Sequence, residues 1–577
     1  MSRKLLAIVS LLILASMVLS ACGPKVAEGT VATGELVTVR GTSTTDIPTL
    51  DPQLGEDTVS IVYIENLFVH LTNYDLVTAD IVPEAATSWD ISEDGLTYTF
   101  TIRTDIPWVN HNPETGEVKQ EVDADGAPRF VTANDFVYGM KRACNPNTGS
   151  YYSGIVAVVI KGCEDVYHYE DPENIPQDLI DAIAVTAPDD ETLVVELPAA
   201  AAYFMSMTPM WTIAATPQWA IEEYGEEWIE AGNIVTSGRY VLNTWEHGVK
   251  RIVLRNPLMP KDMQGAGNVE KFETNVVPDV ATSYSLWLNN EVETSAIPDG
   301  ELEAHLAAFG DETIQVPDLA VFYIAYRMTK APFDNVHVRR AFGAAFDRAT
   351  YVAELRQGQG LPMKHFAPPG IFGAPPIDEI GVGFDPAYAA EQMALAGYPD
   401  CEGFPQVTLL GYSGESTLAW IEFAQAGWEQ HLGCSADLIQ IEQQSFADLL
   451  TATKADDDEA PHMWTLGWGP DYADENNWVG DVLHCTNAIR MKRECNEMDE
   501  LIEEARFESD PEVRKELYAQ IEEGFFGPEG EVPFFPIFLR IAYTAEHSWL
   551  DKVDALFGGD QWYEWTIDAD AQAAATQ

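Results

Sequence analysis

The chain contains seven cysteines, and their spacing discriminates between disulfide formation and metal binding. Cys22 follows an apolar N-terminal segment, so the other six form an even set available for pairing within the chain. No Cys-x-x-Cys occurs and the histidines are not grouped at ligand spacings, which disfavours a metal site. Six cysteines allow about 15 connectivities, so the sequence alone proves none of them. The short separations favour three local pairs: Cys144 with Cys163, Cys401 with Cys434, and Cys485 with Cys495.

A second group capable of chemistry is the carboxylate of Asp471, in a loop that reads Gly-Trp-Gly-Pro-Asp-Tyr from Gly467 to Tyr472. The loop follows a predicted strand over 463–468. A carboxylate removed from water requires a charged or hydrogen-bonding partner. Trp468 and Tyr472 flank Asp471 and could line the same pocket. The alternative is that Asp471 accepts hydrogen bonds only from its own backbone, in an Asx-turn.

The sequence lacks the motifs of the common hydrolases and nucleoside triphosphatases. It contains no Gly-x-Ser-x-Gly, no His-Glu-x-x-His and no Gly-x-x-x-x-Gly-Lys-[Ser/Thr]. A secreted glycoside hydrolase stays open as a distant alternative because such an enzyme needs two carboxyl groups facing one cleft. Nothing in the sequence positions such a pair, so we expect no enzyme activity, no cofactor and no bound metal.

The N-terminus predicts the compartment. Arg3 and Lys4 precede an apolar run over 5–18, which is shorter than the roughly 20 residues of a bilayer span and is typical of a signal peptide. The run ends in Leu-Ser-Ala-Cys-Gly at 19–23, which resembles the lipobox of bacterial lipoproteins. That resemblance implies cleavage before Cys22 and a lipid on its sulfur, with 23–35 as a flexible tether. The alternative is a plain secretory signal with an incidental cysteine.

Size and charge restrict the remaining classes. A chain of 577 residues predicts several domains, about three or four. The excess of 93 Asp and Glu over 32 Lys and Arg gives a formal charge of −61, which repels nucleic-acid phosphates and excludes that class of partner. The charge itself indicates a strongly solvated surface, and adaptation to salt is one hypothesis for its origin.

Local patterns indicate mixed α and β structure. Asp94-Gly95 is a hairpin turn signal, and the residues over 96–103 alternate between apolar and polar, which predicts a strand with one buried face. Thr132 and Asp135 have the spacing of a helix capping box. Asp334 is predicted to cap a helix that runs to about Gln357. The fold class expected from these elements is mixed α/β (α+β).

The order of several short motifs resembles one known family, the extracytoplasmic solute-binding proteins of ABC importers, and within it the family 5 dipeptide- and oligopeptide-binding group. The motifs span about Leu36 to Ala545. They are Thr-Leu-Asp-Pro at 49–52, Ile-Glu-Asn-Leu-Phe at 64–68, Ile-Val-Pro-Glu-Ala-Ala-Thr-Ser-Trp at 81–89, Ser-Glu-Asp-Gly-Leu-Thr-Tyr-Thr-Phe at 92–100, Thr-Ala-Asn-Asp-Phe-Val-Tyr at 132–138, Ser-Gly-Arg-Tyr at 237–240, Val-Arg-Arg-Ala-Phe at 338–342, Phe-Asp-Arg at 346–348 and Gly-Trp-Gly-Pro-Asp-Tyr-Ala-Asp at 467–474.

The resemblance implies a periplasmic binding protein-like fold of type II, with two lobes, a hinge and three domains. Domain I would be discontinuous, domain II would be inserted in it, and domain III would lie between the second and third segments of domain I. The expected bounds are 36–79, 206–315 and 533–577 for domain I, 80–205 for domain II and 316–532 for domain III. The apolar segments 319–324 and 534–539 would cross between the lobes as the hinge.

The resemblance also implies a role for Asp471, which in peptide-binding relatives pairs with the α-ammonium of the ligand. Trp468, Tyr472 and Gly467 would belong to the same ligand site. Trp108 is a second aromatic candidate, although packing within domain II is the favoured interpretation of a tryptophan. Dipeptide-binding relatives have an arginine that binds the ligand carboxylate in the segment that here reads Gly-Tyr-Ser-Gly-Glu-Ser at 411–416. This segment has no arginine, and Ser413 is its candidate ligand-binding residue. Longer peptides, oligosaccharides and other cationic solutes therefore stay open as ligands.

The partners follow from the same resemblance. We expect a peptide or another small solute, a membrane permease with separate ATPase subunits, attachment to the membrane through the lipid anchor, no nucleic acid, and a monomer. The predicted location is extracytoplasmic, in the periplasm or on the outer face of the cell membrane. A peptide-binding chaperone or sensor with this fold is the third alternative, and it would bind ligand without import.

Overall fold

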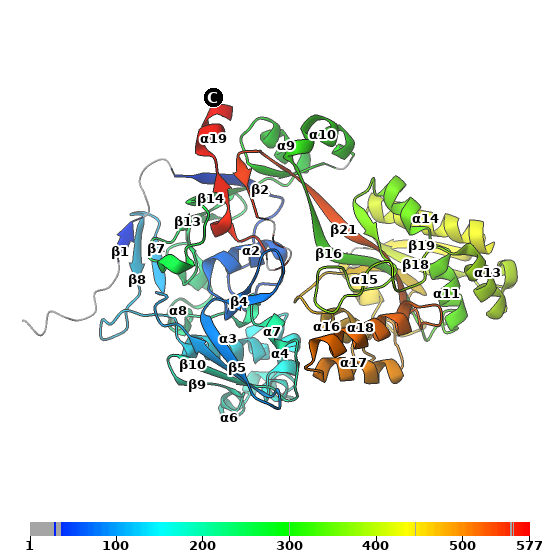
Figure 1. Cartoon of the computed structure of the whole chain (residues 1–577), viewed down its shortest axis with the longest axis horizontal. Helices are drawn as coiled ribbons and strands as arrows, with labels where there is room; N and C mark the ends of the chain where they lie inside the picture. The colour runs from blue at the N-terminus through cyan, green and yellow to red at the C-terminus, as the bar shows by residue number, and fades with distance from the viewer. Residues whose placement is uncertain are drawn as a thin grey trace, which may run out of the picture.

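The protein consists of two lobes joined by a pair of long strands, as seen in a computed structural model (Figure 1). The structure describes residues 28–30, 36–298, 300–444, 446–553, 555, 557 and 559–576. In this part of the chain, no helix has both the length and the apolar composition that crossing a membrane requires. The expected fold class, mixed α and β with two lobes and a hinge, is confirmed.

The two lobes are connected by β16 (Thr313–Tyr326) and β21 (Phe534–Glu546), which pair in antiparallel fashion over most of their length. The two predicted hinge segments lie side by side in this pair, with Val321 opposite Leu539 and Phe322 opposite Phe538. Side chains alternate between the faces of a strand, so both faces of the pair are apolar and both are covered in the second lobe.

The second lobe, built from the chain between these two strands, has one mixed sheet covered on both faces by helices (Figure 1). The strand order is β15-β21-β16-β20-β18-β19, with β17 also paired to β21. The strands between β16 and β21 in the chain are β17 (Gly360–Pro362), β18 (Val407–Tyr412), β19 (Ile439–Gln444) and β20 (Met463–Trp468). β15 (Thr294–Ala296) precedes β16 and extends the sheet at the first-lobe end of β21. The helices are α11 (Val336–Ala344), α12 (Arg348–Thr350), α13 (Pro386–Leu395), α14 (Glu415–Leu432), α15 (Phe446–Ala452), α16 (Asn476–Trp478), α17 (Glu497–Phe507) and α18 (Pro511–Phe526).

The first lobe contains the N-terminal half of the chain and the C-terminal segment, arranged around three four-stranded sheets. Their orders are β1-β8-β7-β11, β5-β6-β10-β9 and β12-β13-β14-β2, beside the small pairs β3-β4 and β22-β23. The strands are β1 (Glu28–Thr30), β2 (Thr38–Ser43), β3 (Thr72–Tyr74), β4 (Ile81–Pro83), β5 (Ala86–Ile91), β6 (Thr97–Ile102), β7 (Val109–Asn112), β8 (Glu117–Gln120), β9 (Val185–Asp189), β10 (Thr192–Glu196), β11 (Val235–Thr236), β12 (Tyr240–Glu246), β13 (Lys250–Arg255), β14 (Lys271–Val276), β22 (Leu550–Asp551) and β23 (Thr566–Ile567). The helices are α2 (Thr58–Leu67), α3 (Ala133–Cys144), α4 (Ser153–Val159), α5 (Cys163–Tyr167), α6 (Gln177–Asp181), α7 (Phe204–Met207), α8 (Gln218–Tyr224), α9 (Val280–Leu288), α10 (Leu302–Phe309) and α19 (Ala569–Ala575).

The local signals of the first lobe are confirmed. Strands β5 and β6 form the predicted hairpin, and Gly95 in its turn has φ of 68°, a conformation that glycine adopts without strain. At the start of α3 the backbone N–H of Thr132 donates to Oδ2 of Asp135 over 2.8 Å, as the capping box requires.

The long helix predicted from Asp334 to about Gln357 is wrong. Asn335 caps α11, whose last residue is Ala344, and a separate turn begins after Asp347, whose carboxylate accepts the N–H of Thr350. The break is stabilised by Arg348, whose guanidinium donates to the carbonyl of Pro536 in β21. A tertiary contact therefore stabilises the end of α11, although the helical pattern of the sequence continues to about Gln357.

The three expected disulfides are present: Cys144–Cys163, Cys401–Cys434 and Cys485–Cys495. The predicted signal peptide and Cys22 lie outside the described residues. Within the predicted tether, Glu28–Thr30 form β1, which pairs with β8 of the first lobe, so this part of the segment is held against the lobe. The expected domain bounds stay predictions.

Candidate ligand-binding site

The register of the central sheet places the loop after β20 at the junction of the lobes. β20 is antiparallel to β16, with Trp468 opposite Val321, so β20 ends where β16 enters the second lobe. Gly467 in β20 lies against the ring of Phe322. A Cβ at this position would come within 2.9 Å of the ring, so a larger residue would not fit. The absence of a side chain at Gly467 allows this packing, and ligand contact by Gly467 stays a prediction.

Asp471 lies in this loop, and its side chain faces groups from both lobes. Its N–H donates to Oδ1 of Asn477 over 3.0 Å, and its Oδ2 accepts Nδ2 of the same asparagine over 3.2 Å. The hydroxyl of Tyr152, in the first lobe, donates to Oδ1 over a long 3.4 Å. These contacts from Asn477 and Tyr152 differ from the Asx-turn alternative, in which the carboxylate would bond to its own backbone.

No cation neutralises the carboxylate of Asp471 within the described part of the chain. Burial raises the pKa of Asp471, and the hydrogen bonds from Asn477 and Tyr152 lower it by less. A buried carboxylate supported only by neutral donors is costly, and a cationic partner would relieve that cost. The site is therefore suited to a positively charged ligand group.

A second carboxylate, Asp481, lies beside the first and was not found by sequence reasoning. Its Oδ2 accepts the hydroxyl of Tyr472 over 2.8 Å and Nδ2 of Asn477 over 3.0 Å. Burial raises the pKa of Asp481 to about 6, and the nearby Asp471 adds to the shift. Asn477 and Asp481 are four residues apart in a helical stretch, a spacing that places them on one face and could have identified the pair.

Tyr472 and Trp468, both predicted for the site, have different surroundings. The ring of Tyr472 is buried and stacks on Tyr203 of the first lobe, with centroids 5.7 Å apart, so it is a contact between lobes. The indole Nε1 of Trp468 donates to Oδ1 of Asn477 over 3.2 Å, and its ring lines a cavity of about 160 Å³ beside the loop. Trp468 therefore lines a cavity beside the loop, and its contact with a ligand stays a prediction.

The end of the loop is fixed by α18. Arg514 donates to Oδ1 of Asp474 over 2.6 Å, and the hydroxyl of Tyr518 donates to the same oxygen over 3.0 Å. All three side chains are buried, and a buried carboxylate paired with a guanidinium holds its geometry firmly. This anchor positions Asp471, which is three residues earlier.

Two other predicted residues are not brought to this loop. Trp108 is fully buried in the first lobe, where its Nε1 donates to Oδ2 of Asp135 over 3.3 Å and its ring packs edge-on against Trp219. Ser413 is exposed after β18, and its Oγ donates to the carbonyl of Gln444 over 2.9 Å. Ligand contact by either residue stays a prediction, and the packing interpretation accounts for the surroundings of Trp108.

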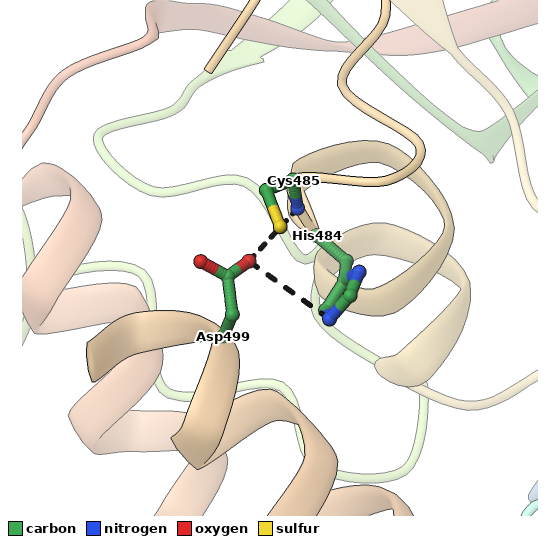
Figure 2. Close-up of side chains that lie close together, drawn as sticks. All are labelled: His484, Cys485 and Asp499. Atoms are coloured by element: carbon green, nitrogen blue, oxygen red, sulfur yellow. Dashed lines mark hydrogen bonds and ion pairs between the residues drawn. The ribbon is translucent and has the colours of Figure 1, made fainter. Parts of the chain in front are cut away.

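The spacing of His484, Cys485 and Asp499 resembles a metal site, but their bonding does not (Figure 2). The sulfur of Cys485 is in the disulfide with Cys495. Although burial raises the pKa of Asp499, hydrogen bonds from Arg493 and from backbone N–H groups lower it overall. Arg493 Nη1 donates to both carboxylate oxygens, over 2.6 and 2.8 Å. The cluster is therefore explained by a disulfide and by a salt-bridged cap of α17.

Comparison with known proteins agrees with this architecture. Residues 80–489 match the family described as bacterial extracellular solute-binding proteins, family 5. The chain is 27% identical over 558 residues to the oligopeptide-binding protein OppA of Bacillus subtilis, covering 93% of this chain and 94% of that protein. It is 25% identical over 497 residues to the periplasmic oligopeptide-binding protein OppA of Escherichia coli, covering 85% of each.

Two solved structures show the same fold. An oligopeptide-binding protein, OppAIV, from Borrelia burgdorferi superposes with a TM-score of 0.70 at 23% identity, covering 92% of this chain and 100% of that one. OppA of Haemophilus influenzae in complex with the peptide RPPGFSPFR superposes with a TM-score of 0.70 at 21% identity, covering 92% and 99%. The match extends through the loop of Asp471 and over most of both lobes, and the chain belongs to family 5 of the bacterial extracellular solute-binding proteins.

Proposed function

We propose that this protein is the lipid-anchored substrate-binding subunit of an ABC importer and that it captures peptides between its two lobes. One observation carries the proposal: the partly buried carboxylate of Asp471 lies at the lobe junction without a cationic partner in the described chain. The α-ammonium of a peptide would supply that partner through a charge-assisted hydrogen bond. Most names of the relatives, among them a dipeptide-binding protein, DppE, of Bacillus subtilis at 26% identity, support peptides as the ligand class. Two relatives at 26% identity are named instead for deoxycholate and for heme.

Capture would be linked to closure of the lobes. Asp471 and Tyr472 of the second lobe contact Tyr152 and Tyr203 of the first. A ligand that bridges these surfaces interacts more strongly with the closed arrangement than with an open one, and only such a difference shifts the equilibrium. The closed, loaded form would then dock on a membrane permease. The chain has no phosphate-binding loop motif, so separate subunits would hydrolyse ATP.

A thermal-shift screen tests the ligand class. Tripeptides, N-acetylated tripeptides and oligosaccharides would be added to the purified protein at about 100 times the expected Kd, where a ligand of the folded state stabilises by about 2.7 kcal/mol. We expect a shift with free tripeptides and a much smaller one with their acetylated forms. A shift confined to oligosaccharides would refute peptide capture.

The anchor is tested separately by Cys22→Ser in a bacterial host that expresses the full chain. We expect the wild-type protein in the membrane fraction with an acylated N-terminal cysteine, detected by mass spectrometry. The variant should lose the lipid and leave that fraction, while Lys25→Gln in the predicted tether should behave as wild type. A Cys22→Ser variant that stays in the membrane fraction with a processed N-terminus would refute lipid anchoring.

A further inference from the structure

A cavity of about 160 Å³ adjoins the Asp471 loop on one face of the central sheet. Its walls include the rings of Tyr323 from β16 and of Trp464 and Trp468 from β20. Trp464 and Trp468 are four residues apart on β20, and Tyr323 is paired with Leu466 midway between them. All three side chains therefore point to the same face of the sheet. A cavity of about 150 Å³ is known to hold one benzene ring, so this one is large enough for a single amino-acid side chain.

One end of the cavity adjoins the carboxylate of Asp471, through a hydrogen-bonded neighbour. Asp481 lines this end. Nδ2 of Asn477 donates to both Asp471 and Asp481, over 3.2 and 3.0 Å, so one amide group separates the two carboxylates. In a peptide, the first side chain is attached to the carbon that carries the α-ammonium. An ammonium at Asp471 therefore places the first side chain at this cavity.

The other part of the lining is cationic, with Arg490 and Lys454. Nη1 of Arg490 donates to the carbonyl of Leu450 and to Oγ1 of Thr453, both over 2.6 Å, which fixes the guanidinium. Neither cation is ion-paired with a carboxylate in the described parts of the chain. Asp481 lines the other end of the cavity and is not ion-paired with either cation. Since the sequence has 93 acidic and 32 basic residues, two cations that line a cavity without an ion-paired carboxylate indicate an anion from outside the chain.

We propose that this cavity receives the first side chain of the bound peptide and that Arg490 and Lys454 select an acidic one, glutamate or aspartate. The inference rests on the proposed function, because it takes the peptide ammonium to be at Asp471. The methylene groups of a glutamate would lie along the tryptophan rings, and its carboxylate would reach the planar guanidinium, which favours two parallel hydrogen bonds. The ammonium and the side-chain carboxylate would then occupy opposite poles of one site.

The test compares Kd values for four tripeptides that differ only at the first residue: Glu-Ala-Ala, Gln-Ala-Ala, Lys-Ala-Ala and Phe-Ala-Ala. Calorimetry on the purified protein should give a Kd for Glu-Ala-Ala at least tenfold lower than for Gln-Ala-Ala, equivalent to about 1.4 kcal/mol. Glutamine has nearly the same shape as glutamate, so the ratio reports the charge. In Arg490→Gln/Lys454→Gln the ratio should fall to about one.

Two further variants separate loss of the cavity's cations from misfolding and from a change in net charge. Lys454→Gln alone changes an exposed side chain and should keep the fold while reducing the ratio, which covers the case in which the double variant does not fold. Lys261→Gln, an exposed lysine of the first lobe, should leave the ratio unchanged and so controls for net charge.

Each other outcome overturns the inference. Equal Kd values for Glu-Ala-Ala and Gln-Ala-Ala, or tighter binding of Phe-Ala-Ala or Lys-Ala-Ala, would refute selection of an acidic side chain while peptide capture itself holds. A glutamate preference that survives in Lys454→Gln and in the double variant would place the recognition elsewhere. If none of the tripeptides binds, the proposed function fails and this inference fails with it.

Discussion

Replacing Asp471 with asparagine separates the charge of this side chain from its shape. Tyr152 donates to Oδ1 of Asp471 and Asn477 donates to Oδ2. Asparagine keeps one oxygen that accepts from Asn477, and its NH2 group can donate to the hydroxyl of Tyr152, which accepts as well as donates. It cannot form an ion pair with a ligand ammonium. Removing one partner of a buried, hydrogen-bonded charge pair costs about 2–5 kcal/mol of binding free energy. We therefore expect the Kd of a free tripeptide to rise by roughly 30-fold or more in Asp471→Asn.

The unliganded protein should respond in the opposite sense. Burial raises the pKa of Asp471, which means that the folded protein disfavours the charged form. The neutral amide avoids that cost, so the Tm of the ligand-free variant should equal or exceed that of the wild type. A simple loss of folding would lower both the Tm and the affinity and is thereby distinguished from the loss of one ion pair.

The assay is calorimetric titration of a tripeptide and of its N-acetyl derivative into both proteins, with Asp437→Asn as the control. Asp437 is an exposed aspartate of the same lobe, so its replacement changes the net charge equally and leaves the site intact. Acetylation should weaken binding to the wild type and to the control but have little effect on Asp471→Asn. If Asp471→Asn binds the free tripeptide as tightly as the wild type, or if acetylation weakens binding equally in both, the assignment of Asp471 to the ammonium is wrong.

Three further results are expected. The folded-state pKa of Asp481 is about 6 and exceeds the unperturbed value of 3.8, so the stability that the protonated side chain contributes is present below about pH 4 and disappears as the pH rises through 6. The Tm of Asp481→Asn should therefore exceed that of the wild type by a margin that grows between about pH 4 and pH 6. A margin that does not change with pH would contradict the shift. Removing Cys401–Cys434, which spans 33 residues, should cost about 4 kcal/mol of unfolding free energy, against about 3 kcal/mol for Cys485–Cys495, which spans 10, with urea denaturation as the measurement and the reverse order as the contradiction. Because the formal charge is −61, the Tm should rise between 0.1 and 1 M NaCl as the Debye length falls from about 10 to 3 Å, and a flat response would remove self-repulsion as a factor.

Local chemistry made several elements readable from the sequence. The hairpin around Asp94-Gly95 and the capping box of Thr132 and Asp135 depend on residues a few positions apart, whose backbone groups must find partners nearby. The disulfide pairs were predictable for the same reason, because short loops keep the paired cysteines close. The predicted helix from Asp334 failed because Arg348 bonds to a strand almost two hundred residues later, which no local pattern encodes.

The sequence by itself determined the family, the order of the motifs and the loop that carries Asp471. Only the tertiary structure decided what surrounds that carboxylate. Tyr152 is 319 residues away in the chain, and it reaches Asp471 because the paired strands β16 and β21 hold the lobes against one another. The cavity with Arg490 likewise depends on which face of β20 each side chain points to, and on the packing of a loop across that face. Burial and facing are properties of the packed sheets and helices, so the chemistry of the site was fixed only when the fold brought distant residues together.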